Sequence, residues 1–164
     1  MMGAGKSSVG RALAEISGRE FMDTDLLLQN RFGRPVYQIF EVYGEEAFRQ
    51  HETSVLTGLE PSNCVLATGG GIVGREANWA EMHRLGLTIY LNASLETLVA
   101  RLECSKKKRP LLLEDTWPDR VEALLAQRRP LYERADIVVP VESDDVKGIA
   151  SRVYEAILSS QHER

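Results

Sequence analysis

The chain opens with the residues MMGAGKSS, and a helical pattern follows at once. Gly3 and Gly5 let backbone N–H groups turn toward an anion, Lys6 suits the β- and γ-phosphates, and the Ser7 hydroxyl suits Mg²⁺. Apolar residues then recur at helical spacing, and the N-terminus of that helix adds its dipole. The segment predicts a phosphate-binding loop, although a disordered polar start is the alternative if it is taken alone. The full loop pattern also requires a glycine one place before Met1.

Strand and helix patterns alternate along the rest of the chain. Four apolar segments read as strands: residues 19–25, 64–71, 87–93 and 136–141. Between and after them, helical patterns cover residues 26–32, 36–43, 45–59, 77–85, 95–102, 119–132 and 146–157. This order predicts an α/β domain with a mainly parallel sheet, in which ligands gather at the carboxyl ends of the strands.

Composition excludes several classes of function. The 164 residues suit one domain, 1–164, and the net charge of −4 gives no global sign of nucleic-acid binding. No apolar run approaches the roughly 18 residues of a membrane span. Cys64 and Cys104 form no CxxC pair, and the three histidines lack metal spacing. We expect a cytoplasmic monomer that binds neither nucleic acid nor a membrane.

Two acids follow the first predicted strand. Asp23 and Asp25 are two residues apart, so in a continued strand their side chains share one face. One could face Mg²⁺ while the other accepts a hydrogen bond from a substrate hydroxyl. The alternative is a turn in which Asp25 caps the following helix.

Glycines and arginines mark the other predicted strand and helix ends. Three consecutive glycines, residues 69–71, sacrifice stability and imply that something approaches the backbone closely. Arg109 lies in a basic excursion that breaks the helical periodicity, where a closing lid could bring a cation onto a phosphoryl group. Arg49 lies on a predicted helix, where a solvated charge is the ordinary interpretation. Arg128 lies at the end of a predicted helix, where it could bind a carboxylate or a phosphate, and the alternative is that it complements the helix dipole.

Taken together, these motifs resemble the shikimate kinase family, a group of small P-loop kinases. The segments GAGKSS, DTD, GEEAFR, TGGG, RPLL and RRPLYERAD occur in the family's order over nearly the whole chain. The resemblance implies a three-layer P-loop kinase fold, a substrate-binding region at about residues 24–60 and a lid at about 103–117. It also implies transfer of the γ-phosphoryl group of ATP to the 3-hydroxyl of shikimate, with Mg²⁺, in the biosynthesis of aromatic amino acids.

The resemblance also implies roles for individual residues. The loop residues Gly3, Ala4, Gly5, Lys6, Ser7 and Ser8 would bind ATP, and Arg101 would pack on its adenine. Ser7 and, through water, Asp23 would hold Mg²⁺. The catalytic group would be Lys6, Asp25 and Arg109, with Arg109 closing over the phosphates. Shikimate would contact Asp25, Arg49, Gly70, Gly71, Arg128, Phe40 and Phe48.

The chain departs from the family at its start. Members begin with a central strand of about five residues that leads into the phosphate loop, and no such segment precedes MMGAGKSS. We therefore expect unpaired edges on both neighbouring strands, an unfilled apolar slot between them, and a natural chain that starts several residues earlier. Two alternatives stay open: a related small-metabolite kinase such as gluconate kinase, and a catalytically impaired relative that acts as a binding domain.

Overall fold

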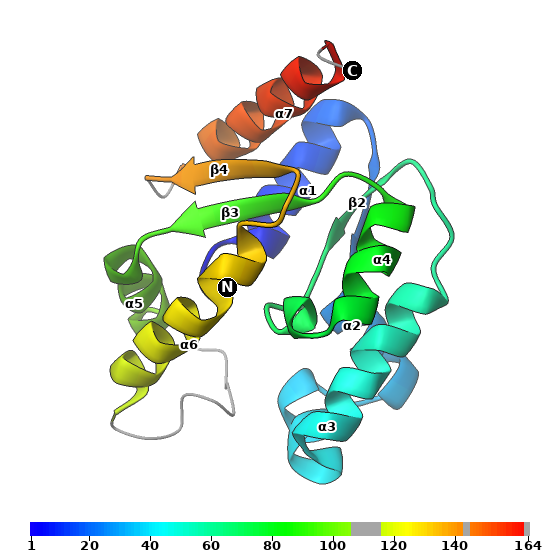
Figure 1. Ribbon diagram of the computed structural model, residues 1–164, viewed down its shortest axis with the longest axis vertical. Helices are drawn as coiled ribbons and strands as arrows, with labels where there is room; N and C mark the ends of the chain where they lie inside the picture. Colours follow the sequence, from blue (N-terminus) through cyan, green and yellow to red (C-terminus); the bar gives the residue numbers. More distant parts are fainter. Residues whose placement is uncertain (106–115, 143–144, 163–164) are drawn as a thin grey trace.

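A computed structural model describes residues 1–105, 116–142 and 145–162 (Figure 1). All four predicted strands are present, and each predicted helix corresponds to a helix in the structure. In chain order the elements are α1 (Lys6–Ser17), β1 (Glu20–Asp23), α2 (Thr24–Phe32), α3 (Val36–Thr57), β2 (Cys64–Ala67), the 3₁₀ turn η1 (Ile72–Gly74), α4 (Glu76–Leu85), β3 (Ile89–Ala93), α5 (Leu95–Glu103), α6 (Trp117–Tyr132), β4 (Ile137–Val141) and α7 (Val146–His162).

The strands form two parallel pairs. β1 pairs with β2, with Glu20 opposite Cys64, and β3 pairs with β4, with Ile89 opposite Ile137. Over the described residues the two pairs are not hydrogen-bonded to each other. Figure 1 shows α4 in front of the strands and α1 behind them, which gives the three layers expected of the fold.

An apolar slot lies between the facing edges of β2 and β3. It is a cavity of about 470 Å³. Its lining includes β2 and β3 themselves, together with Val9 and Leu13 of α1, Trp79 of α4 and Val153 of α7. Parallel strands need hydrogen-bond partners on both edges when they are buried. The expected unpaired edges and unfilled slot are therefore both present.

The amino terminus lies against this slot. Met1 is 3% exposed and belongs to the main hydrophobic core. Burial of its amino group, together with the nearby charges of Lys6 and Arg128, lowers the pKa of that group well below its usual value. A charged amine is costly in such a place, because few groups remain to solvate it.

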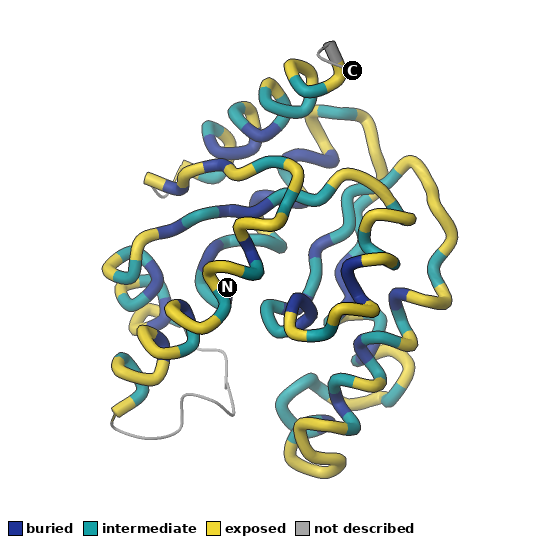
Figure 2. Tube along the Cα trace, viewed as in Figure 1, coloured by how far each residue is buried: buried dark blue, intermediate teal, exposed yellow. Residues whose placement is uncertain are grey.

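Helix α1 shows why the loop and the strands sit as they do. The helix lies between Gly5 and Gly18, which are both in the left-handed region, at φ 88° and φ 65°. Its buried face contains Val9 and Leu13. At Gly10 a Cβ atom would lie 2.8 Å from the ring of Phe21, so the missing side chain lets the helix pack closely on β1. Figure 2 shows buried residues along β3 and along the facing side of α7.

Helix α3 is bent at Gly44, whose φ of 78° and ψ of 170° are not helical. The turns around the bend are exposed (Figure 2). Leu28, Ile39 and Phe48 form a second, smaller core that joins α2 to α3. Within the described part of the chain, no helix has the length and apolarity needed to cross a membrane.

Candidate active site

The phosphate loop has the shape that its glycines predicted. Gly3 and Gly5 adopt φ values of 78° and 88°, which glycine reaches without strain. The Lys6 ammonium donates a hydrogen bond of 2.7 Å to the carbonyl oxygen of Met1. The first N–H groups of α1 have no partner within the helix, as at any helix start, so they are available to an anion. Such backbone donors beside a lysine suit the phosphates of a nucleotide.

Ser7 and Asp23 meet directly at the end of β1. The Ser7 hydroxyl donates a 2.7 Å hydrogen bond to the Asp23 carboxylate, which is 8% exposed. The other carboxylate oxygen of Asp23 accepts the backbone N–H of Asp25, so Asp23 caps α2. The interpretation of Asp25 as the helix cap is therefore wrong. A hydroxyl and a carboxylate beside a phosphate site are hard oxygen ligands, and they fit Mg²⁺.

A second cavity lies behind the phosphate loop. It measures about 160 Å³ and is lined by Gly5, Ser8, Val9, Arg101, Val146 and Ile149. Arg101 donates a 3.3 Å hydrogen bond to the carbonyl of Gly3, which holds its guanidinium against the loop. Apolar side chains on one side and a planar cation on the other suit an aromatic base. The role on adenine that the resemblance implied for Arg101 stays a prediction.

Two carboxylates converge on the glycine turn after β2. A Cβ atom on Gly69 would lie 3.2 Å from Asp25 Oδ1 and would collide with the carboxylate of Glu52. The Gly69 N–H donates to the Thr24 hydroxyl at 3.1 Å, which fixes this turn to the start of α2. The close approach inferred from the three glycines is confirmed: the groups that approach are side chains of α2 and α3.

Arg49 lies beside the same turn. Its guanidinium donates to Glu52 at 2.6 Å and to Glu45 at 3.2 Å, and it fills the space that a Gly71 side chain would need. Burial opposes its charge, but Glu52 and Glu45 outweigh burial and raise the pKa of Arg49 further. Arg49 therefore stays a cation next to Gly71.

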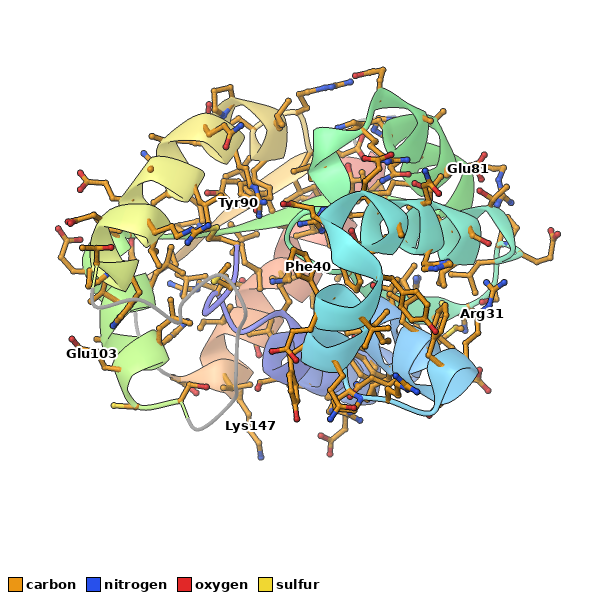
Figure 3. The ribbon with its side chains drawn as sticks, turned by 90° about the horizontal axis from the view of Figure 1, so that it is seen from below. Arg31, Phe40, Glu81, Tyr90, Glu103 and Lys147 are labelled. Atoms are coloured by element: carbon orange, nitrogen blue, oxygen red, sulfur yellow. The ribbon has the colours of Figure 1, made fainter. Side chains whose placement is uncertain are left out.

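Helix α6 closes the other side of this region. Arg128 is close enough to Glu52 and to the Tyr132 hydroxyl for its charge to oppose the rise that burial causes in the pKa of both groups. Phe40 and Phe48 pack against each other on α3 with ring centroids 5.5 Å apart. Figure 3 shows Phe40 on α3, while Tyr90 lies next to α6.

The structure thus brings together the residues expected to bind the acid substrate, from four separate segments of the chain. They are Asp25 on α2, Arg49 with Phe40 and Phe48 on α3, the turn at Gly70 and Gly71, and Arg128 on α6. Arg109 and most of the expected lid, residues 106–115, lie outside the described residues.

Glu52 is a member of this cluster that the sequence motifs did not identify. It is 1% exposed and lies on the buried stripe of α3 with Phe48 and Leu56. An acid in an apolar helical stripe is unusual, and that spacing was the available signal. Burial raises the pKa of Glu52, Arg49 opposes the shift, and the charge on Asp25 adds to it.

We expect Glu52→Gln to change how stability depends on pH. The pKa of Glu52 is higher in the folded state than its ordinary value of 4.5. The contribution of protonated Glu52 to the free energy of unfolding is therefore fully present below pH 4.5, and it is lost as pH rises through the folded-state pKa. In denaturant unfolding, the wild type should therefore lose free energy of unfolding relative to Glu52→Gln as pH is raised from 4.5. Glu41→Gln, an exposed carboxyl on the same helix, is the control. Parallel profiles for the wild type and Glu52→Gln would contradict this expectation.

Comparison with known proteins identifies the relatives of this chain. The family model for shikimate kinase matches residues 2–158. The shikimate kinase of Prochlorococcus marinus is 40% identical over 94% of this chain and 81% of its own length, and that of Vibrio cholerae is 39% identical over 95% and 90%. The structure of shikimate kinase from Acinetobacter baumannii in complex with shikimate superimposes with a TM-score of 0.92 at 37% identity, covering 97% of this chain and 89% of the other. For the Aquifex aeolicus enzyme the TM-score is 0.81 at 31% identity, with 98% and 94% covered.

Proposed function

This chain belongs to the shikimate kinase family, and on that premise we propose how its residues carry out the transfer of the γ-phosphoryl group of ATP to the 3-hydroxyl of shikimate. The observation that carries the proposal is a cluster at the glycine turn after β2: Asp25 lies against Gly69, Arg49 lies against Gly71, and Arg128 is within electrostatic reach of Glu52 between them. A small acid with several hydroxyl groups needs cations for its carboxylate and acceptors for its hydroxyls, and this cluster supplies both.

The phosphate loop holds the nucleotide. Backbone N–H groups from Gly3 to Ser8 surround the phosphates, and Lys6 exchanges its hydrogen bond to Met1 for the β- and γ-phosphate oxygens. Ser7 and, through water, Asp23 would hold Mg²⁺, which would neutralise phosphate charge. Arg101 packs against the adenine in the 160 Å³ cavity.

The cluster beside the glycine turn holds the acid. Arg49 and Arg128 bind the carboxylate from α3 and α6, and the N–H groups of Gly70 and Gly71 donate to ring hydroxyls. Phe40 and Phe48 cover the apolar part of the ring. Together these contacts leave the 3-hydroxyl next to Asp25, on the side of the phosphate loop.

The chemical step needs positioning and charge stabilisation more than covalent help. The 3-hydroxyl oxygen forms a bond to the γ-phosphorus, the bond to the bridging oxygen of ADP breaks, and the hydroxyl proton passes to Asp25. Lys6 stabilises the charge that develops on the phosphoryl oxygens. Arg109 would add a second cation from the lid.

Coupled measurement of ADP release, with shikimate or gluconate as acceptor, tests the proposal. We expect turnover with shikimate and none with gluconate. Because Arg128 donates to a charged group, Arg128→Ala should raise KM for shikimate about 10- to 100-fold and leave KM for ATP unchanged. Arg129→Ala, an exposed neighbour on α6, should behave as the wild type. Turnover with gluconate, or an unchanged KM for shikimate in Arg128→Ala, would argue against this binding mode.

A further inference from the structure

The hydroxyl of Tyr132 joins two parts of the site. Tyr132 is the last residue of α6, and its hydroxyl donates a 2.6 Å hydrogen bond to the carbonyl oxygen of Gly70. Arg128, one helical turn earlier, lies close enough to the same hydroxyl for its charge to lower the pKa of the phenol in part. The side chain is buried, with 6% of Tyr132 exposed, so this hydroxyl depends on protein partners rather than bulk water.

The direction of the hydrogen bond to Gly70 follows from the chemistry of the groups. A phenol has one proton, which goes to the Gly70 carbonyl, and the lone pairs that remain on the Tyr132 oxygen attract the nearby guanidinium of Arg128, which can only donate. Burial raises the pKa of Tyr132, although the charge of Arg128 lowers it in part. The phenol therefore keeps its proton at neutral pH.

Holding the Gly70 carbonyl also orients the next N–H group. The peptide bond between Gly70 and Gly71 is planar and trans, so the Gly71 N–H points away from the Gly70 carbonyl. Glycines restrict their own backbone least of all residues, and a run of three needs an outside anchor to stay in one conformation. The Tyr132 hydroxyl supplies that anchor.

The ring that presents the hydroxyl is itself held in place. It stacks on Tyr90 of β3, with centroids 5.0 Å apart and an angle of 20° between the ring planes. The hydroxyl of Tyr90 donates elsewhere, to Asn92 at 3.1 Å. The stack on Tyr90 of β3 therefore holds the Tyr132 ring, at the end of α6, in a fixed position beside Gly70.

We propose that Tyr132 is a positioning residue for the acid substrate, whose hydroxyl holds the Gly70 carbonyl and the Arg128 guanidinium so that Arg128 and the Gly71 N–H face the substrate together. The proposal rests on the proposed function, because it uses the roles assigned there to Arg128 and Gly71. Tyr132 is not among the residues assigned to substrate binding above. It acts through two of them, Arg128 and Gly71.

The variant Tyr132→Phe tests this directly, because it keeps the stacked ring and removes only the hydroxyl. We expect KM for shikimate to rise about tenfold, the effect of losing one hydrogen bond to a charged group. KM for ATP, and kcat at saturating shikimate, should stay within about twofold of the wild type, since the phosphate loop is untouched. A general loss of structure would instead lower kcat and affect both substrates.

Tyr90→Phe is the matched control, since it removes a hydroxyl from the stacked partner, and it should leave KM for shikimate unchanged. A folded Tyr132→Phe with wild-type KM for shikimate would overturn the proposal. If the wild type itself shows no shikimate-dependent ADP release, the proposed function fails instead, so the two failures are distinguishable.

A measurement on the wild type covers the case in which Tyr132→Phe does not fold. The ¹³Cζ resonance of a labelled Tyr132 reports the hydrogen bonding of its hydroxyl. Since Arg128 gains the substrate carboxylate as a partner, saturation with shikimate should shift this resonance, and the resonance of Tyr90 should stay in place. An unchanged Tyr132 resonance would also overturn the proposal.

Discussion

A chain extended before Met1 by five apolar, mainly β-branched residues and a glycine should unfold at a temperature about 10–20 °C higher than residues 1–164 alone. The added segment would enter the slot of about 470 Å³ and pair with the free edges of β2 and β3. It would also turn the buried amine of Met1 into an amide, which removes the penalty of burying a charged group.

The magnitude follows from the bonds that such a strand would make. Each hydrogen bond contributes about 0.5–1.5 kcal/mol, so several on two edges give about 5 kcal/mol before apolar burial is added. For a domain of this size, 1 kcal/mol corresponds to about 2–4 °C in the unfolding midpoint. Differential scanning calorimetry measures the shift. An extension of equal length made of glycine and serine is the control, and equal midpoints for the two extensions would show that the slot does not accept a strand.

Asp25→Asn should lower kcat with shikimate about 10²- to 10⁴-fold, the usual cost of losing a general base. Asp25 lies at the start of α2, with its carboxylate near Gly69 and Glu52, whereas the nucleotide contacts belong to the phosphate loop. Asparagine has nearly the same shape but cannot take up the proton of the 3-hydroxyl. The affinity for ATP should therefore remain nearly unchanged.

Steady-state ADP release measures the expected fall in kcat, and equilibrium binding of ATP measures the expected unchanged affinity. Asp119→Asn, an exposed acid in the first turn of α6, is the control and should retain wild-type kcat. Unaltered turnover in Asp25→Asn would refute the role of general base. Weakened ATP binding would instead place Asp25 on the nucleotide side.

Much of the fold could be predicted because its elements carry strong local patterns. The apolar segments that became β2 and β3 are bounded by breakers, and the helices show regular apolar spacing. The gap between β2 and β3 could be predicted as well, because a parallel sheet of this kind needs a central strand. The break at Gly44 could be predicted as well, because separate helical patterns cover residues 36–43 and 45–59 and the glycine between them suits a turn.

The candidate site was predictable in its residues but not in their partners. The motifs include Arg49 but not Glu52, which follows it by three residues on the same helix. Charged residues on an amphipathic helix are usually solvated, so Glu52 was missed. Tyr132 lies within the RRPLYERAD segment, but the segment indicates no role for it, because its proposed role depends on the Gly70 carbonyl, far away in the sequence. Contacts of this kind arise from tertiary packing, which local spacing does not encode.

The buried pair of Arg49 and Glu52 has a consequence for the energetics of binding. Asp25 and Glu52 already balance the charges of Arg49 and Arg128, so an incoming carboxylate adds a negative charge beside a carboxyl whose pKa burial has raised. Added negative charge raises that pKa further, and part of the balance is then restored by a proton. If the acid binds here as proposed, we therefore expect its association to be coupled to proton uptake, so that the enthalpy observed by calorimetry depends on the ionisation heat of the buffer.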